Sequence, residues 1–470
     1  MTILPCIKVP SPQEIHAKLF PKGVVKPISL SAVWRAPMLL TPFGGNSTST
    51  ISPSDQLTAG SVTYDAKDPN QRLMRTKLYL LETLQYYDFL FHTSNGTTRW
   101  WWLVSDPGAQ DDLPTKAYGP FSASADVPSQ AFLAENGFSN PGTWNVAGRP
   151  LTSFSARKTG RAGTWYWFNA SSDPTRIMNV NNNNDFKVAI LGSYYFVDLP
   201  KVERLTSSNL EAVYKKCQNS SGGSGSAGPM LTLADILRSM ATPPSGAQTS
   251  CTLDQIRSLI PGISLPEGPV NPPAWTNKVS SECFMIGQDL YPYYCQVWYD
   301  WDQGTQVTVF VQQDTNGSYS VRFDEMLPKG HVGPAIVYAW NGSQWTPSCC
   351  EANGGFVPMP VPNFVEAGGG VCRATIANNS YFGNLSIWSV ALGDASGNWK
   401  SDFWYWFNNK DQGVLFSLAP AGSLTVIDYQ TFVQNGTIEA CVFDNPCGEI
   451  SACSGNQAMA LRRKPRFMSH

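Results

Sequence analysis

Three aspartates are the strongest candidates for acid–base chemistry in this chain. Asp88 and Asp300 each follow a tyrosine, and Asp302 lies two residues beyond Asp300. On an extended segment Asp300 and Asp302 would face the same way, as the carboxylates of an acid/base pair or of a calcium loop do. The segment from Asp300 to Gly304 also fits a hairpin turn without any catalytic role. Both interpretations stay open from the sequence.

Other catalytic motifs are missing from the sequence. The four histidines form neither HExxH nor any other paired metal-binding spacing. The sequence contains no phosphate-binding GxxxxGK[ST], no Rossmann glycine motif after a strand and no G-x-S-x-G nucleophile elbow. We therefore predict no metal and no cofactor, and the sequence leaves open whether the chain is an enzyme.

Aromatic residues offer a second kind of site, for binding. The letters WYWFN begin at Trp165 and again at Trp404. In a strand, Trp165 and Trp167 would face one way and the residues between them the other, and the same holds for Trp404 and Trp406. Such a strand is either core on both faces or the lining of a ligand cavity or sugar-stacking platform. We take these four tryptophans as candidate ligand contacts, with Arg176 as a pocket anchor.

The sequence around these aromatic strands occurs twice in the same order. Aromatic segments begin at Tyr86 and Trp298, the WYWFN strands follow, and β-like stretches come after them at 187–200 and 422–433. Chance similarity between aromatic strands is the alternative to a duplicated domain. A duplication predicts a first β-rich domain over 1–216, a Gly/Ser/Pro-rich linker with two short helices over 217–275, and a second β-rich domain over 276–470. In this scheme Asp88 and Asp300 occupy equivalent places.

The composition fits the architecture that these elements require. Aromatic residues make up 12% of the chain and charged residues 14%, against about 25% charged in typical proteins. This balance argues against coiled coils and against general disorder. The net charge of −2 gives no support for nucleic-acid binding. We predict a mainly β protein with two related antiparallel curved-sheet or sandwich-like domains and a few short helices.

Cysteines and sequons bear on the compartment. Cys6 stands alone, and the other ten cysteines all lie from Cys217 onward. This pattern favours up to five disulfides in the second half over reduced thiols or a metal site. Nine Asn-X-Ser/Thr sequons, such as that of Asn95, are either glycosylation sites or plain turns. No signal peptide or membrane span is visible, yet we expect an extracellular or secretory glycoprotein.

One segment resembles a known family. The stretch that carries Gly60, Tyr64, Asp65, Gln71 and Arg72 is similar to the opening of ependymin-related proteins over some thirty residues. The resemblance implies a curved antiparallel sheet that forms a lipoprotein-carrier-like half-barrel around an apolar pocket, often with calcium. No functional residue is transferred by it.

Three functions follow from these features. The first is a non-enzymatic binding protein that holds an apolar or amphipathic small molecule in aromatic-lined β pockets. The second is a carbohydrate-binding or adhesion protein, which needs its tryptophan rows at the surface. The third is a carboxylate-dependent hydrolase or cyclase that uses Asp88, Asp300 or Asp302 beside an aromatic pocket.

Overall fold

A computed structural model provides the fold of the chain. The structure describes residues 2–4, 6–19, 29–40, 56–107, 113–124, 126–146, 149–156, 164–168, 176–178, 203–219, 240, 242–247, 249–286, 292–313, 319–326, 332–352, 359–379, 383–393, 400–410, 412–418, 425–444 and 451–452. Most of the described elements are antiparallel strands, so the prediction of a mainly β protein with few short helices is confirmed.

We distinguish two units by the order of their elements. The first unit contains β3 (Val33–Leu40), β4 (Thr58–Asp68), β5 (Gln71–Leu80), β6 (Gln85–Ser94), β7 (Thr97–Val104), β8 (Lys116–Ala123), α2 (Phe132–Glu135), β9 (Ser139–Val146), β10 (Arg149–Ala156), β11 (Thr164–Phe168), β12 (Arg176–Met178), β13 (Glu203–Arg204) and α3 (Leu210–Gln218). The second unit contains β16 (Lys278–Ile286), β17 (Pro292–Asp300), β18 (Thr305–Gln313), β19 (Tyr319–Met326), β20 (Val332–Trp340), β21 (Trp345–Ala352), α6 (Phe364–Ala367), β22 (Val371–Asn379), β23 (Gly383–Gly393), β24 (Lys400–Asn408), β25 (Gly413–Leu418), β26 (Thr425–Tyr429), β27 (Val433–Gln434), η3 (Ala440–Phe443) and β28 (Ser451–Ala452). An N-terminal arm of β1 (Thr2–Leu4), β2 (Ile7–Lys8) and α1 (Pro12–Leu19) precedes them, and β14 (Thr249–Ser250), α5 (Leu253–Leu259) and β15 (Ile263–Ser264) connect them.

The strands of each unit pair mostly with their neighbours in the chain. In the first sheet the order is β13-β3-β4-β5-β6-β7-β8, and β9 to β12 form a separate sheet. In the second unit one sheet runs from β22 through β26 to β16 and on to β21. Tight turns allow this meander, as at Asn95 and Gly96, which both have positive φ and join β6 to β7.

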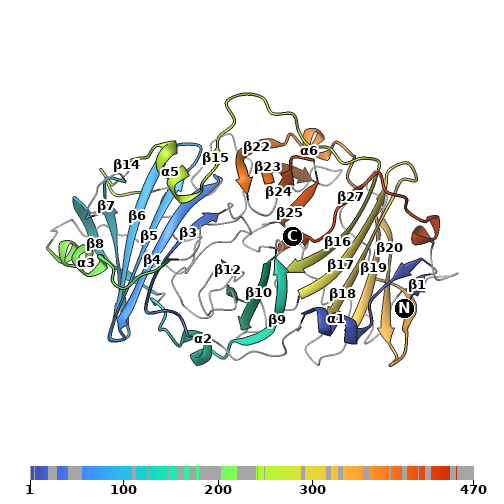
Figure 1. The fold of residues 1–470 in the computed structure, drawn as a ribbon, viewed down its shortest axis with the longest axis horizontal. Coiled ribbons are helices and arrows are strands. Elements are labelled where there is room, and N and C mark those ends of the chain that lie inside the picture. Colours follow the sequence, from blue (N-terminus) through green and yellow to red (C-terminus); the bar gives the residue numbers. More distant parts are fainter. Residues whose placement is uncertain are drawn as a thin grey trace.

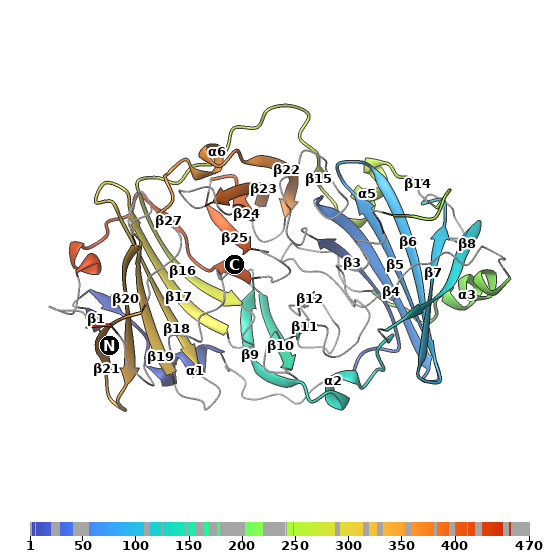
Figure 2. The same cartoon turned by 180° about the vertical axis from the view of Figure 1, so that it is seen from behind.

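The two largest groups of strands lie on opposite sides of the molecule. Figure 1 shows β3–β8 in blue on one side and β16–β20 in yellow on the other, with β22–β25 and β9–β10 between them, and Figure 2 shows the same arrangement from behind. α3 lies on the far side of the first sheet, away from the second unit. The first sheet therefore has an inner face directed toward the second unit and an outer face beneath α3.

The two units make the same hydrogen bonds at the same places. The hydroxyl of Tyr64 donates to the carbonyl of Pro128 over 2.8 Å, and that of Tyr299 donates to the carbonyl of Pro360 over 2.9 Å. Each of these prolines lies four residues before a short helix, α2 or α6. The helices end alike, because the amides of Phe138 and Gly370 donate to the carbonyls of the equivalent residues Leu133 and Val365. A shared fold of the two units explains these coincidences.

Strand register supports the same correspondence. In each unit a hydrogen bond holds the segment just before the first strand. The amide of Leu30 donates to the carbonyl of Gln130 in the first unit, and the amide of Trp275 donates to the carbonyl of Pro362 in the second. β11 and β24 also occupy matching places, because each pairs with the strand before it and the strand after it. The central tyrosine of each strand has an aromatic partner on the preceding strand: Tyr166 pairs with Phe154 and Ile177, and Tyr405 pairs with Trp388 and Phe416. The helix-ending bonds are Phe138 N to Leu133 O at 2.9 Å and Gly370 N to Val365 O at 2.7 Å.

The correspondence corrects the predicted pairing of the aspartates. Because Tyr64 matches Tyr299, the residue equivalent to Asp300 is Asp65. Asp88 lies on β6, two strands further along the sheet than β4. The prediction that Asp88 and Asp300 are equivalent is therefore wrong. It relied on a shared Tyr-Asp pair, which occurs in both β4 and β6.

The N-terminal arm packs on the second unit. Cys6 forms a disulfide with Cys441, and the indole nitrogen of Trp345 in β21 donates to the carbonyl of Pro10. The prediction that Cys6 stands alone is thus wrong, because sequence cannot reveal a partner 435 residues away. Cys283 pairs with Cys295 across β16 and β17, as expected for the second half, whereas Cys217, Cys251 and Cys372 are free thiols.

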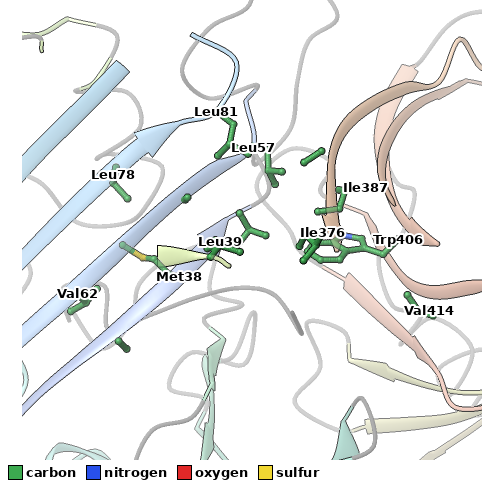
Figure 3. Close-up of a cluster of buried hydrophobic side chains, with 14 of the residues drawn as sticks. Met38, Leu39, Leu57, Val62, Leu78, Leu81, Ile376, Ile387, Trp406 and Val414 are labelled. Carbon is green, nitrogen blue, oxygen red and sulfur yellow. The ribbon is translucent and has the colours of Figure 1, made fainter. Parts of the chain in front are cut away.

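An apolar boundary joins the two units. Figure 3 shows Leu39, Leu57 and Leu81 of the first unit on the side that faces Ile376, Ile387 and Trp406 of the second unit. All six are at most 2% exposed. At the edge of this boundary Arg373 donates to both carboxylate oxygens of Glu82, at 2.8 and 2.9 Å.

The connection between the units belongs partly to their sheets. β14 pairs with β6 of the first unit and β15 pairs with β22 of the second. α5 begins with a capping box of Thr252 and Gln255. The predicted linker over 217–275 therefore contains segments that take part in both sheets. The domain boundaries themselves stay a prediction.

Candidate functional site

The inner face of the first sheet carries two rows of large side chains. Leu73, Leu90 and Trp101 pack beneath α3 on the outer face, so the residues that alternate with them, such as Met74 and Trp100, lie on the inner face. Because paired residues of neighbouring strands share a face, the register gives each row directly. The rows are Trp34, Tyr64, Met74, Phe91, Trp100 and Phe121, and Ala36, Val62, Thr76, Phe89, Trp102 and Tyr118. We call these residues the aromatic face.

The rings of the aromatic face contact one another. Trp34 stacks on Tyr64 with ring centroids 5.4 Å apart. Trp100 and Phe121 are 4.6 Å apart, and Phe89 and Trp102 are 4.9 Å apart. Tilted contacts of this kind fix the orientation of each ring. The aromatic face is therefore an ordered surface.

The aromatic face is covered rather than open to solvent. Its most exposed member, Tyr118, is only 9% exposed, and Trp34, Phe89 and Trp100 are fully buried. Its residues belong to one apolar cluster with Phe132 of α2 and with residues of the second unit. A molecule that reaches this face must therefore displace a cover or enter while the protein opens.

Several polar atoms of the aromatic face have no hydrogen-bond partner within the described part of the chain. They are Trp34 Nε1, Thr76 Oγ1, Trp100 Nε1 and Trp102 Nε1. The tyrosines of the same face differ, because Tyr64 and Tyr118 donate to the carbonyls of Pro128 and Ser245. Leaving a buried donor unsatisfied costs about 1–3 kcal/mol for each group. The indole nitrogens of Trp101 on the outer face and of Trp275 in the second unit likewise have no partner among the described residues. What distinguishes the aromatic face is that four such groups lie together on it.

Charge is missing from the aromatic face. None of its twelve members is ionisable at neutral pH, and Arg75 lies on the outer face. Arg72 does lie on the inner face, two residues before Met74 in β5, and its guanidinium donates to the carbonyls of Val127 and Pro69. Tyr64 does not change this, because burial raises the pKa of its hydroxyl above the usual value. The aromatic face thus offers apolar surface and neutral donors.

The outer face holds the predicted catalytic residue Asp88 in an ion pair. Arg75 donates from Nε to Asp88 Oδ1 at 2.9 Å and from Nη2 to Oδ2 at 2.6 Å. The hydroxyls of Tyr86 and Ser105 also donate to Oδ2, each at 2.8 Å. Burial alone would raise the pKa of Asp88, but the Arg75 guanidinium and its hydrogen bonds hold that pKa below its usual value. A carboxylate so occupied anchors its neighbours and is a poor general base.

α3 covers this ion pair. Leu210, Val213 and Cys217 face the sheet and are buried. Burial and the nearby charge of Asp88 raise the pKa of the Cys217 thiol to about 12. This thiol stays protonated at neutral pH and is a weak nucleophile.

Asp300 and Asp302 form part of a turn. Asp300 is fully buried and accepts hydrogen bonds from the backbone and side-chain nitrogens of Gln303, at 3.1 and 3.0 Å. Lys278 Nζ lies 3.4 Å from Asp300 Oδ2. Asp302 is exposed and accepts from Asn277. These contacts fit the hairpin interpretation, and the fold does not bring either residue to Asp88, which lies in the sheet of the other unit.

The predicted ligand contacts fall into two groups. Trp406 is buried in the boundary between the units, and its neighbours Tyr405 and Phe407 pack on Phe364 of α6 from the other side. This arrangement is that of a core strand covered on both faces. The strands that hold Trp165, Trp167, Arg176 and Trp404 are described, with Trp167 opposite Arg176, but their side chains lie outside the described residues.

Sequence reasoning missed most of the aromatic face. In the run Trp100–Trp102, strand alternation puts Trp100 and Trp102 on one face and Trp101 on the other. Trp101 indeed belongs to the outer cluster beneath α3, beside Tyr214. Nothing in the sequence indicated that Trp34 and Thr76 share the face of Trp100, because that depends on the order of the strands.

Three side chains of metal-binding types lie together where the N-terminal arm meets the second unit. Among the described residues, the ligand atoms of Cys6, Glu439 and Cys441 lie within 4.8 Å of one another. Both sulfurs are joined in a disulfide and are no longer thiolate ligands. The group therefore does not act as a metal centre in this structure.

Comparisons with known proteins leave the family of this chain open. No family model matches the sequence, and no curated protein matches it either. One similar solved structure is that of PNGF-II in a C2 space group, with a TM-score of 0.20 and 9% identity. The match covers 40% of this chain and 33% of that chain. A TM-score this low does not establish a shared fold.

The helices of the structure are short. No helix among the described residues is long and apolar enough to cross a membrane.

Proposed function

We propose that the protein is a non-enzymatic binding protein that holds an apolar or amphipathic small molecule against the aromatic face. The observation that carries the proposal is the set of buried donors on Trp34, Thr76, Trp100 and Trp102, which lack partners within the described residues. A bound molecule with acceptor atoms would satisfy donors that otherwise destabilise the folded protein. The surrounding rings would bury its apolar part.

The proposal concerns one site rather than a pair. In the second unit, Val279 and Gln306 stand where the first unit has Trp34 and Met74. The corresponding face of the second unit therefore loses a large ring and gains a buried amide. We expect one molecule to bind per chain.

The two alternative functions have less support. Stacking on sugar rings needs exposed aromatic side chains, whereas eight described tryptophans are at most 8% exposed: Trp34, Trp100, Trp101, Trp102, Trp275, Trp345, Trp388 and Trp406. Trp298, Trp301 and Trp340 are only partly exposed. A carboxylate-dependent enzyme needs a free carboxylate beside its substrate. Asp88 and Asp300 are fully engaged by their neighbours, and Asp302 is exposed in a turn.

An extracellular setting belongs to the same proposal. The disulfides Cys6–Cys441 and Cys283–Cys295 are typical of proteins that fold in an oxidising compartment. The sequon residues Asn95 and Asn341 are exposed in turns, where a glycan would fit. Intact-mass measurement of the native protein before and after glycosidase treatment tests this point.

Native mass spectrometry after gentle extraction, together with uptake of a fluorescent lipid, tests the binding function. We expect a co-purifying mass and saturable uptake. Trp100→Phe and Trp102→Phe remove an indole N–H but keep a ring, and should weaken uptake. Trp101→Phe is the matched control, because Trp101 is equally buried in the same strand but faces α3. A clean apo mass with no uptake, or an equal loss in all three variants, would refute the proposal.

A further inference from the structure

The chemistry of the aromatic face narrows the class of ligand, and this step rests on the function proposed above. Indole nitrogens only donate hydrogen bonds, so each of Trp34, Trp100 and Trp102 needs an acceptor atom to satisfy it. Thr76 can donate or accept. A matching ligand must therefore carry acceptor oxygens, which a pure hydrocarbon does not have.

Charge gives the second restriction. The twelve members of the aromatic face include no cation and no anion. The guanidinium of Arg75 is on the opposite face and is bound to Asp88 at 2.6 Å. The guanidinium of Arg72, which lies beside the aromatic face, donates to the backbone carbonyls of Val127 and Pro69. Bringing an ionised carboxylate, phosphate or ammonium onto a buried surface without a partner is strongly unfavourable. The ligand that fits is neutral.

Spacing gives the third restriction. Trp100 and Trp102 alternate along one strand, so their Cα atoms are about 7 Å apart, and Thr76 lies two strands from Trp102, at about 10 Å. One molecule can span these three positions. Trp34 is four strands from Trp100, about 19 Å away, and needs a longer molecule or a second acceptor group.

We infer that the aromatic face takes a neutral lipid-like molecule that carries carbonyl oxygens, such as an ester or ketone, in preference to a fatty acid or a hydrocarbon. The oxygens accept from Trp100, Trp102 and Thr76, and the chain lies along the rings of Phe89 and Phe91. None of the twelve members offers a cation to a carboxylate headgroup, and the guanidinium of Arg72 beside them already donates to the carbonyls of Val127 and Pro69.

The test compares three ligands that share one chain length: the alkane, the methyl ester and the free acid at a pH where it is ionised. Each displaces a neutral fluorescent lipid probe from the full chain. We expect the methyl ester to bind at least tenfold more tightly than the alkane and than the acid anion. Lowering the pH until the acid is neutral should bring its affinity close to that of the ester.

Two variants show which residues distinguish the ester from the alkane. Thr76→Val removes one donor at nearly constant volume, and should weaken the ester several-fold while leaving the alkane unchanged. Trp102→Phe removes one donor together with one ring of the indole, and should weaken the ester more than the alkane. Thr308→Val is the matched control, since Thr308 takes the place of Thr76 in the second unit. Circular dichroism and thermal unfolding confirm that each variant is folded.

The outcomes separate this inference from the proposed function. Binding of all three ligands without discrimination, or an anion that binds as tightly as the ester, overturns the inference and leaves the binding function standing. An equal loss of alkane and ester in Trp102→Phe also overturns it. Failure of every ligand and of the probe to bind removes both.

Discussion

Asp88 of the first sheet occupies the position that Phe323 occupies in the second. Asp88 pairs with Lys77 across β5 and β6, and Phe323 pairs with Val309 across the equivalent strands β18 and β19. Arg75 likewise corresponds to Val307. The same sheet is therefore built once around a buried ion pair and once around apolar residues. The ion pair is not a requirement of this fold.

The first prediction follows from that comparison. Asp88→Ala leaves the buried Arg75 guanidinium without its partner and should lower the free energy of unfolding by about 3–5 kcal/mol. Arg75→Met combined with Asp88→Leu, which imitates the second unit, should recover most of that loss. Urea denaturation followed by circular dichroism measures both. A double variant as unstable as Asp88→Ala would contradict the prediction.

The second prediction concerns pH. Burial of His92 lowers the pKa of its imidazole, with Glu211 acting in the opposite direction and Arg99 in the same one. The folded protein then binds fewer protons than the unfolded chain as the pH falls below about 6.5, the ordinary value for histidine. Stability from this residue is present above that pH and is lost as the pH falls toward the lowered folded value.

The ring centroids of His92 and Tyr214 are 4.1 Å apart. His92→Phe keeps a ring against Tyr214 and should reduce the loss of stability at low pH. Unfolding free energies at about pH 7.5 and about pH 5.5 give the measurement. Glu211→Gln is the control for the neighbouring carboxylate. Removing the negative charge of Glu211 should lower the pKa of His92 further and so increase the loss of stability at low pH. An unchanged slope in His92→Phe would show that another group causes it.

The third prediction concerns the N-terminal arm. Cys441→Ser removes the disulfide to Cys6 and should lower the free energy of unfolding by about 2–5 kcal/mol. The arm, which also contacts Trp345 through Pro10, should then become a preferred site of proteolysis. Limited digestion with peptide mapping checks this. Cys251→Ser, at a free buried thiol, should leave the digestion pattern of the arm unchanged.

The fourth prediction is the stoichiometry of binding. Titration of the methyl ester followed by native mass spectrometry should saturate at one molecule per chain, because only the first unit has Trp34 and Met74 at the inner positions. Gln306→Met makes the second unit more like the first and should not by itself create a second site, since Val279 still replaces the tryptophan. Saturation at two molecules in the parent protein would contradict the proposed single site.

Local chemistry predicted part of the fold from sequence. The capping boxes of Ser11 with Glu14 and of Thr252 with Gln255 both form. Asn95 with Gly96 forms the expected turn. These features depend on residues close together in the chain, so their spacing is enough to predict them.

Features that depend on strand order were not predictable in the same way. The bond between Cys6 and Cys441 and the equivalence of Asp65 with Asp300 both require the full topology. The aromatic face also depends on the topology. Strand alternation separates Trp101 from Trp100 and Trp102, but it does not show that Trp34 lies on the same face as those two residues. Sequence thus identified aromatic strands as candidates, and the sheet decides which rings meet.

The position of the N-terminal arm has a consequence for biosynthesis. Cys6 leaves the ribosome early, whereas its partner is made 435 residues later. At about 5–20 residues per second, this delay is about 20–90 s. The first unit can complete its sheet within that interval, with Cys217 and Cys251 enclosed in its interior and in its connection to the second unit. Early burial of Cys217 and Cys251 would keep these two thiols from forming a wrong crosslink with Cys6.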